Sequence, residues 1–424
     1  MKDKHTWDWQ TNKKEIPIKD WQNDFNWVEE PYVSPDGEKI AAIVNQDEAE
    51  FSVCVNGETW EETFEKAWSL KFASDGKLTV LASKDEEWSV CTDGVFWDSW
   101  FDFIWDLQLS ADGQFISVAV QKDSQYGMAV NDKQWDTFFD NISGMVLSDQ
   151  GTTAAIVQVQ PLGQADLVSF DAGIFSAAVN GVAYPEKFMN AWDLCFDGQG
   201  KQVAYAIRKN RSDYSIVKNN TIWDPVFQSA WKPEFFNQDQ SVAAPVRLNG
   251  KWVLFKDGNP FWNKQFGQLW KLCVHYGSQK TDGSQKIAAI VSDEYGKWSI
   301  CENNKTWNFQ CNNMISDLSY SDDGSQLIAT CKHDGLWDII VNQRPWHLKA
   351  DKLWQPVVSS DNHIITTRME KDGKYYLVVN KKVYPQSFDM VFEPRISPDN
   401  DKILLKSINS GIYSRQVLSL DKVL

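Results

Sequence analysis

A short turn motif recurs along the whole chain at intervals of about 40 residues. Its fullest copy is Ser-Pro-Asp-Gly at residues 34–37, and the later copies end at Gly76, Gly113, Gly151, Gly200, Gln240, Gly283, Gly324, Asn362 and Asn400. From Gly37 to Asn400 the ten copies span 363 residues in nine steps. This period indicates a repeated supersecondary unit that buries its hydrophobic face against its neighbours.

Each copy of the motif is followed by an apolar, β-branched run of strand length. The run KIAAIV occurs at residues 39–44 and again at residues 286–291. A second such run leads into an Asn-Gly or Asp-Gly pair, as at residues 56–57 and 93–94, and these pairs favour tight hairpins. No stretch keeps the period of a long helix. The sequence therefore predicts an all-β fold, a β-propeller of about ten four-stranded repeats.

Eighteen of the 22 Trp residues keep fixed distances from the turn motif. The first position holds Trp21, Trp60, Trp97, Trp135, Trp223, Trp262, Trp307 and Trp346, with Tyr184 and Tyr384 as substitutes. A second position, eight residues further on, holds Trp68, Trp105, Trp192, Trp231, Trp270 and Trp354, and a third holds Trp88, Trp252, Trp298 and Trp337. We interpret these rings as wedges packed between neighbouring sheets.

The two ends of the chain carry complementary parts of one repeat. The last repeat has its first aromatic residue at Tyr413 and stops before the second, whereas Trp21 precedes Gly37 by the same 16 residues that separate Trp60 from Gly76. We therefore expect residues 1–16 to be a tail, and the array at residues 17–424 to have its last repeat completed by the N-terminal segment. Ten repeats exceed the usual four to eight of one ring, so a single ring and two smaller rings are both compatible with the count.

Four Trp residues lie outside the register, namely Trp7, Trp9, Trp27 and Trp100. Exposed Trp is a preferred anchor at protein interfaces, so these four are the candidate partner interface. Trp7 and Trp9 are the stronger pair because they stand in a polar segment ahead of the first repeat. The alternative is that the rings, Trp100 in particular, fill local gaps.

The net charge of −16 narrows the classes of partner. An acidic chain without a Lys/Arg-rich run lacks the electrostatic footprint of a nucleic-acid-binding protein and is repelled by anionic lipid surfaces. The polar start of the sequence is unlike a signal peptide, and no window approaches 18 consecutive apolar residues. We expect a cytoplasmic protein with no nucleic-acid partner and no direct membrane insertion.

The sequence offers little site chemistry. The seven Cys include no CxxC pair, and His5, His275, His333, His347 and His363 stand apart from one another. Cys54, Cys91 and Cys301 occupy matching strand positions, which is typical of small core residues. We therefore predict no catalytic residue, no metal site and no bound cofactor. The numerous carboxylates leave a propeller hydrolase acting on a sugar or peptide as an alternative.

Two family resemblances follow from these motifs. The runs SPDGEKIAAIV (34–44), SADGQFISVAV (110–120) and SDDGSQLIATC (321–331) resemble the WD40-like or PD40 repeat of bacterial propellers. The Trp-rich stretches SVCVNGETW (52–60), CTDGVFWDSWFDFIWDL (91–107) and VNDKQWDTFFDNI (130–142) resemble the tryptophan-rich TmcD subunits of the Tmc transmembrane electron-transfer complex of sulfate-reducing bacteria.

The second resemblance implies a function without implying any catalytic residue. In that family the redox groups belong to other subunits, which are a multihaem cytochrome c, a membrane cytochrome b and an iron–sulfur protein. The resemblance implies a cofactor-free docking or assembly propeller on the cytoplasmic side, peripherally associated with the inner membrane through these partners. A free-standing peptide-binding scaffold is the further alternative, because a propeller fold alone does not specify function.

Overall fold

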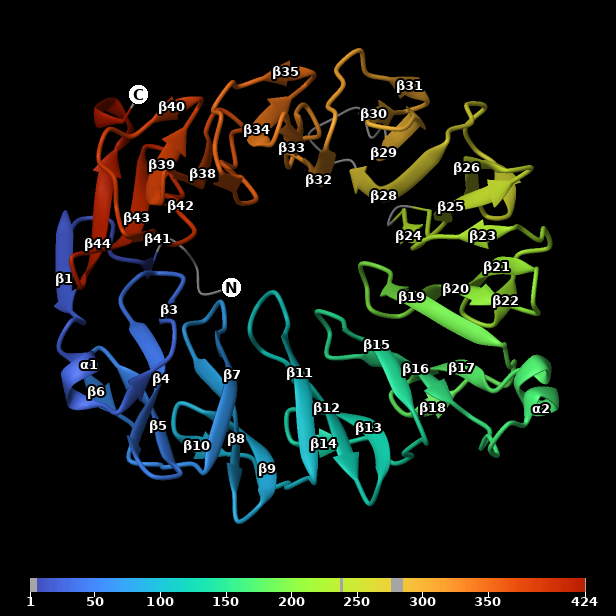
Figure 1. The fold of residues 1–424 in the computed structure, drawn as a ribbon, viewed down its shortest axis with the longest axis horizontal. Helices are drawn as coiled ribbons and strands as arrows, with labels where there is room; N and C mark the ends of the chain where they lie inside the picture. Colours follow the sequence, from blue (N-terminus) through green and yellow to red (C-terminus); the bar gives the residue numbers. More distant parts are fainter. Residues whose placement is uncertain (1–5, 237–238, 276–284, 424) are drawn as a thin grey trace. The chain divides into compact units, whose positions relative to one another are not determined.

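The computed structural model describes residues 6–236, 239–275 and 285–423, and in them short antiparallel strands form ten sheets (Figure 1). Six sheets have four strands and four have five. The additional strand in each of these four has two residues, and the pairs that it forms are β3 with β4, β24 with β25, β37 with β38 and β42 with β43. These sheets are blades of the β-propeller type, so the predicted fold class is confirmed. The repeat start at Gly283 and the side chain of His5 lie outside the described residues.

The first five sheets contain the strands β2 to β22 of Figure 1, whereas β1 belongs to the last sheet. Their bounds are β1 (Lys13–Pro17), β2 (Trp27–Val28), β3 (Tyr32–Val33), β4 (Ile40–Asp47), β5 (Glu50–Val55), β6 (Glu58–Thr59), β7 (Lys66–Phe72), β8 (Leu78–Lys84), β9 (Glu87–Thr92), β10 (Val95–Phe96), β11 (Phe103–Leu109), β12 (Ile116–Lys122), β13 (Gln125–Val130), β14 (Lys133–Gln134), β15 (Ile142–Leu147), β16 (Thr153–Gln158), β17 (Phe175–Val179), β18 (Val182–Ala183), β19 (Asn190–Phe196), β20 (Val203–Arg208), β21 (Tyr214–Lys218) and β22 (Thr221–Ile222).

The second five sheets contain the remaining strands. Their bounds are β23 (Ser229–Ala230), β24 (Glu234–Phe235), β25 (Val242–Leu248), β26 (Lys251–Lys256), β27 (Asn259–Pro260), β28 (Gln268–His275), β29 (Lys286–Glu294), β30 (Lys297–Glu302), β31 (Lys305–Thr306), β32 (Met314–Tyr320), β33 (Leu327–His333), β34 (Leu336–Val341), β35 (Arg344–Pro345), β36 (Lys352–Leu353), β37 (Val357–Val358), β38 (Ile365–Lys371), β39 (Lys374–Val379), β40 (Lys382–Val383), β41 (Met390–Val391), β42 (Arg395–Ile396), β43 (Lys402–Asn409) and β44 (Ile412–Ser419). Helices in the described residues are short, at α1 (Trp21–Asp24), α2 (Leu167–Ala172) and a 3₁₀ turn at Leu420–Lys422. None of them is long and apolar enough to cross a membrane.

The chain divides into two compact units. Unit 1 comprises Met1–Gln114, Leu336–Asp338 and Trp346–Leu424, and unit 2 comprises Phe115–Gly335 and Ile339–Pro345. The clusters and pockets described below each lie within one unit.

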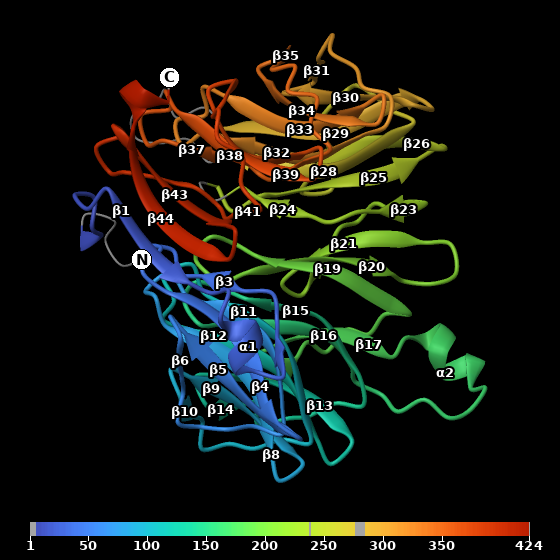
Figure 2. The same cartoon turned by 60° about the vertical axis from the view of Figure 1, so that its left-hand side comes forward.

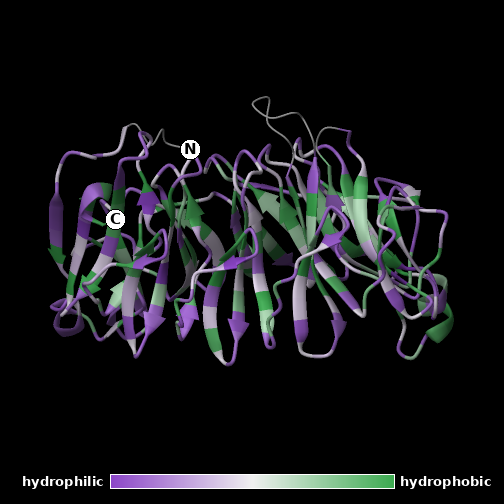
Figure 3. Ribbon diagram, turned by 90° about the horizontal axis from the view of Figure 1, so that it is seen from above, coloured by the Kyte–Doolittle hydropathy of each residue, from purple (hydrophilic) through white to green (hydrophobic). Residues whose placement is uncertain are grey.

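The repeated motifs form the predicted turns. Ser34 Oγ donates to Asp36 Oδ1 at 2.6 Å, and the backbone N–H of Glu38 donates to the same oxygen, while Gly37 takes a φ of 74°. At the Asn-Gly hairpin, Asn56 and Gly57 both have positive φ. Hydrophobic residues lie mainly within the strands and hydrophilic residues mainly in the turns (Figure 3).

The last sheet is completed from the N-terminal side of the chain, as predicted. Strand β1 pairs antiparallel with β44, which gives the order β1-β44-β43-β41 (Figure 2). Trp21 is buried in a cluster that also contains Tyr413, so the two aromatic residues expected to share this repeat do pack together. Strand β1 begins at Lys13, inside the segment that we assigned to the tail.

Trp residues at the first register position pack between consecutive sheets. Trp223 lies in a cluster with residues of β20 and β25, and Trp262 lies in the next cluster with residues of β25 and β29. The wedge prediction is thus confirmed for these rings. It is wrong for Trp231 and Trp270 at the second position, which are 43% and 38% exposed. Both lie on or beside the first strand of a sheet and contact a ring on the third strand of the same sheet, since Trp231 stacks on Trp252 at 5.4 Å and Trp270 lies 6.1 Å from Trp298 between centroids.

Candidate anion-binding pocket

A pocket of about 550 Å³ opens in unit 1, and its lining is rich in cations. The lining residues come from strands β3, β7, β36, β38, β39, β41, β42 and β43 and from the turns next to them. Five of them are basic, namely Lys71, Lys352, Arg368, Arg395 and Lys406, and two are acidic, namely Glu30 and Glu393. We call this the basic pocket. An excess of positive charge here contrasts with the net charge of −16 of the whole chain.

Four of the five cations occupy unusual positions of the repeat. Arg368 and Lys406 each follow the end of their turn motif by six residues. In the other repeats that strand position holds only uncharged residues, which are Ile43, Ala82, Ala119, Val157, Ala206, Val246, Ala289 and Thr330. Lys71 and Arg395 likewise share one position, five residues before the end of their motif. A basic residue inside an apolar strand run is the sequence signal for this pocket, and neither the aromatic register nor any catalytic motif indicates it.

Lys406 lies at the most buried part of the lining, with only 2% of its surface exposed. Its Nζ donates to the carbonyl oxygens of Ser34 and Pro35 at 3.4 Å each, and it forms no ion pair with a carboxylate in the described part of the chain. Burial, and then the positive charge of Arg395, lower the pKa of Lys406 to about 7. Lys406 is therefore a buried amine that is easily deprotonated and whose positive charge, when present, has no carboxylate partner among the described residues.

The two arginines of the pocket also have unused hydrogen-bonding capacity. Arg368 Nη1 donates to the Val391 carbonyl at 2.6 Å, and Arg395 Nη2 pairs with Glu393 Oε2 at 3.1 Å. The Nε–H groups of both arginines are buried and have no hydrogen-bond acceptor among the described residues. Burial lowers the pKa of Arg368. Buried donors without acceptors are costly, so an anion that accepts from them is stabilised here.

Aromatic rings form part of the pocket wall. The guanidinium carbon of Arg368 lies 4.4 Å from the ring centroid of Trp354, and Lys352 Nζ lies 4.7 Å from the same ring. Tyr375 is 5.7 Å from Trp354 between centroids. Trp354 was predicted only as a packing wedge, but it also orients two of the cations. The combination of apolar walls and convergent cations is suited to binding an anionic group on a carbon skeleton.

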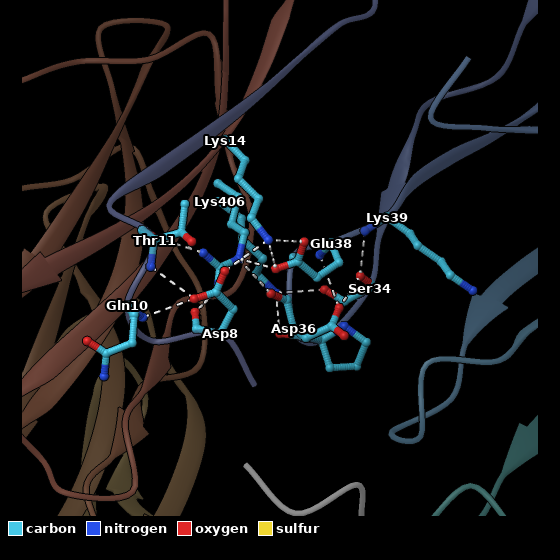
Figure 4. Close-up of polar contacts among 12 residues, drawn as sticks. Asp8, Gln10, Thr11, Lys14, Ser34, Asp36, Glu38, Lys39 and Lys406 are labelled. Atoms are coloured by element: carbon cyan, nitrogen blue, oxygen red, sulfur yellow. Dashed lines mark hydrogen bonds and ion pairs between the residues drawn. The ribbon is translucent and has the colours of Figure 1, made fainter. Parts of the chain in front are cut away.

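The N-terminal segment is fastened beside this pocket by a polar cluster, which we call the clasp (Figure 4). Lys14 Nζ lies between Asp8 Oδ2 at 3.0 Å and Glu38 Oε2 at 2.7 Å. The hydrogen bond with Glu38 raises the pKa of Lys14, and hydrogen bonding to Thr11 lowers the pKa of Asp8. Arg415, which is buried, pairs through Nε with Glu38 Oε1 at 3.0 Å and donates through Nη2 to the carbonyl of Asp8.

The four predicted interface residues are not brought together. Trp7 and Trp9 are buried, with their rings stacked at 6.1 Å and packed against Leu404 in unit 1. Trp100 is half-buried and lies 4.9 Å from the ring of Phe96. Trp27 is 51% exposed, and it is the only one of the four whose side chain is largely accessible to solvent. A partner interface at these residues stays a prediction, and Trp27 is the residue on which it now depends.

Other chemistry is sparse in the described residues. Within 6–236, 239–275 and 285–423, no group of three His, Cys, Asp or Glu side chains is placed to hold a metal ion. Burial raises the pKa of the matched thiols Cys54, Cys91 and Cys301, which keeps them protonated and unreactive.

Comparison with known proteins finds only distant structural similarities. No family model and no curated protein matches the sequence. Among solved structures, the chain is similar to a eukaryotic initiation factor, with 11% identity and a TM-score of 0.42 over 89% of this chain and 98% of that one. The Dos1 propeller gives 12% identity and a TM-score of 0.34 over 93% and 92% of the two chains. Prolyl oligopeptidase B from Galerina marginata gives 10% identity and a TM-score of 0.37 over 72% and 55%. Similarities this distant extend no function to this chain.

Proposed function

We propose that this protein is a non-catalytic docking propeller that holds a partner protein by an acidic segment inserted into the basic pocket. The observation that carries the proposal is the set of five cations and two carboxylates around one pocket, with two buried Nε–H groups left without acceptors in the described residues. A carboxylate-bearing segment supplies the missing acceptors and the missing negative charge. A volume of about 550 Å³ accommodates a few acidic side chains.

The partner in this proposal belongs to a membrane-bound electron-transfer complex. The resemblance of the Trp-rich stretches to TmcD subunits implies an iron–sulfur protein, a membrane cytochrome b and a multihaem cytochrome c as partners. The protein then needs no cofactor of its own, acts in docking or assembly, and reaches the cytoplasmic face of the inner membrane through these subunits.

Co-purification tests the proposal. Tagged wild-type protein is expressed at native level, recovered from detergent-solubilised membranes, and analysed for haem and iron–sulfur absorption. We expect both signals to co-elute with the wild type and to be lost with the double variant Arg368→Met/Arg395→Met. Arg247→Met is the matched control because Arg247 is an exposed cation of unit 2.

Three outcomes contradict the proposal. One is recovery of the wild-type chain without any partner. Another is equal partner recovery by the wild type and the double variant. The third is hydrolysis of a peptide or sugar substrate by the purified protein that is lost on Glu393→Gln, which would favour the hydrolase alternative.

A further inference from the structure

Lys406 differs from the other cations of the basic pocket because it is buried, with 2% of its surface exposed. The guanidinium group of an arginine keeps its charge at physiological pH, whereas a buried lysine readily loses its proton. The charged groups around Lys406 are Arg395 from β42, Arg368 from β38, Glu393 beside β42, Asp36 from the turn before β4, and Arg415, its register partner on β44.

The surrounding charges leave Lys406 without a counter-ion. Burial, Arg395 and Arg368 together disfavour its charged form, and the weaker opposing effects of Glu393 and Asp36 come from carboxylates that form no ion pair with it. Glu393 is instead paired with Arg395, and Arg415 is paired with Glu38. The Cγ and Cδ atoms of Lys406 lie close to the turn at Gly37, where a Cβ would come within 3.2 Å of both. Its Nζ contacts two carbonyl oxygens and no carboxylate in the described part of the chain, so a carboxylate that enters the pocket would supply the partner that its charge lacks.

We propose that the basic pocket binds a carboxylate together with a proton, which moves from solvent to Lys406 Nζ as the carboxylate enters. This inference rests on the proposed docking function and specifies how docking is regulated. No bond other than the new N–H is formed, and the ion pair of ammonium and carboxylate replaces a neutral amine and an open pocket. Docking of an acidic segment thereby becomes sensitive to pH.

The direction of the pH effect follows from linkage. The free pocket loses its Lys406 proton as the pH rises through about 7, and a bound carboxylate raises that pKa. The bound state then holds more protons than the free state above pH 7, so affinity falls with rising pH by up to about tenfold per unit. Below pH 7 both states hold the proton and Lys406 contributes no further change.

A binding titration with a hexaglutamate peptide tests the inference, with hexaglutamine as the uncharged control. Calorimetry at constant ionic strength is run from pH 6.5 to 9, a range in which the Glu side chains stay ionised. We expect the wild-type affinity to fall roughly tenfold between pH 7 and 8.5. Repeating the pH 8 titration in buffers of different ionisation enthalpy should show uptake of up to one proton per peptide.

Two substitutions at the same position separate proton uptake from simple attraction. Lys406→Arg keeps its charge at every pH, so its affinity should stay high and flat up to pH 9. Lys406→Met should bind weakly and equally at all pH values. Thermal unfolding of each variant checks that the fold is retained.

The experiment distinguishes failure of the proton coupling from failure of the proposed docking. If the wild type binds hexaglutamate with no pH dependence and no proton uptake, or if Lys406→Met keeps the wild-type pH dependence, proton coupling is wrong and docking stands. If hexaglutamate binds no better than hexaglutamine at any pH, acidic docking at this pocket is wrong as well.

Discussion

Lys406 and Arg415 are two buried basic residues on paired strands, and they differ in how far neighbouring groups compensate their charge. They are register partners on β43 and β44, and 2% and 1% exposed. Arg415 pairs with Glu38 and donates to the carbonyls of Asp36 at 3.2 Å and Thr11 at 3.4 Å, as well as to that of Asp8. Lys406 has two carbonyl contacts at 3.4 Å and no carboxylate partner in the described part of the chain.

The difference separates a structural cation from a functional one. The N-terminal segment and the turn before β4 each supply acceptors to Arg415, so that its charge is satisfied within the fold and holds this segment against β44. Lys406 has two carbonyl acceptors but no carboxylate partner among the described residues, and it lines a pocket together with Arg368 and Arg395. An uncompensated buried charge destabilises a fold, which is typical of a group retained for binding.

The largest expected effect on stability comes from removing Arg415, which belongs to the clasp. Arg415→Met removes the donor from Glu38 and from three carbonyls, and we expect a loss of about 3 kcal/mol in the free energy of unfolding. Urea unfolding at pH 7 measures it, with Arg247→Met as the exposed control within about 0.5 kcal/mol of wild type. A loss below about 1 kcal/mol would mean that Arg415 is no more engaged than Lys406.

The next effect concerns how the clasp is held in place. Trp9 is buried against Trp7 and Leu404, so Trp9→Ala should lower the free energy of unfolding by about 2 kcal/mol. Hydrogen exchange should show β1 amides opening faster in this variant, because the segment that reaches Arg415 is loosened. Unchanged exchange at β1 would show that the stacked rings do not hold the segment.

Removing the other cation should act with the opposite sign. Lys406→Met replaces an uncompensated buried charge, so we expect a gain of about 1–3 kcal/mol in the free energy of unfolding at pH 7. In the wild type the folded-state pKa is about 7 and the unfolded value is about 10.4, so the unfolded chain binds more protons between these limits. The wild type therefore recovers stability as the pH rises from 7 towards 10, and the gap to the variant should shrink. Urea unfolding at both pH values measures this, and a variant less stable than wild type at pH 7 would contradict it.

The smallest effect on stability is expected at Trp27. Its ring is half exposed and makes an edge contact with Phe51 at 6.5 Å, so Trp27→Ala should change the free energy of unfolding by less than about 1 kcal/mol. Neither Lys406 nor Arg415 contacts it, so hexaglutamate binding should stay at the wild-type level. If Trp27 anchors a partner, membrane co-purification alone should fall, and unchanged recovery would remove it from the interface.

Much of the fold could be predicted because its causes are local. The Ser34–Asp36 hydrogen bond and the positive φ values at Asn56 and Gly57 depend on a few adjacent residues, so their sequence signals recur wherever the turn does. Trp21 and Tyr413 could be assigned to one repeat by spacing alone, because a period identifies equivalent positions whatever their separation. Spacing does not report exposure, so it could not reveal that Trp231 is open while Trp223 is buried.

The amino-acid sequence by itself determined the repeat length, the turns, the strand pattern and the pairing of the chain ends, since all four follow from short-range chemistry repeated in phase. Only the tertiary structure decided that Lys71, Arg368 and Lys406 line one pocket, that Trp7 and Trp9 are buried, and that, among the described residues, a carboxylate pairs with Arg415 but not with Lys406. The physical reason is that burial and charge compensation depend on which distant strands meet. A lysine in an apolar strand indicates an unusual position, and its neighbours in space decide whether its charge is satisfied there or available to a ligand.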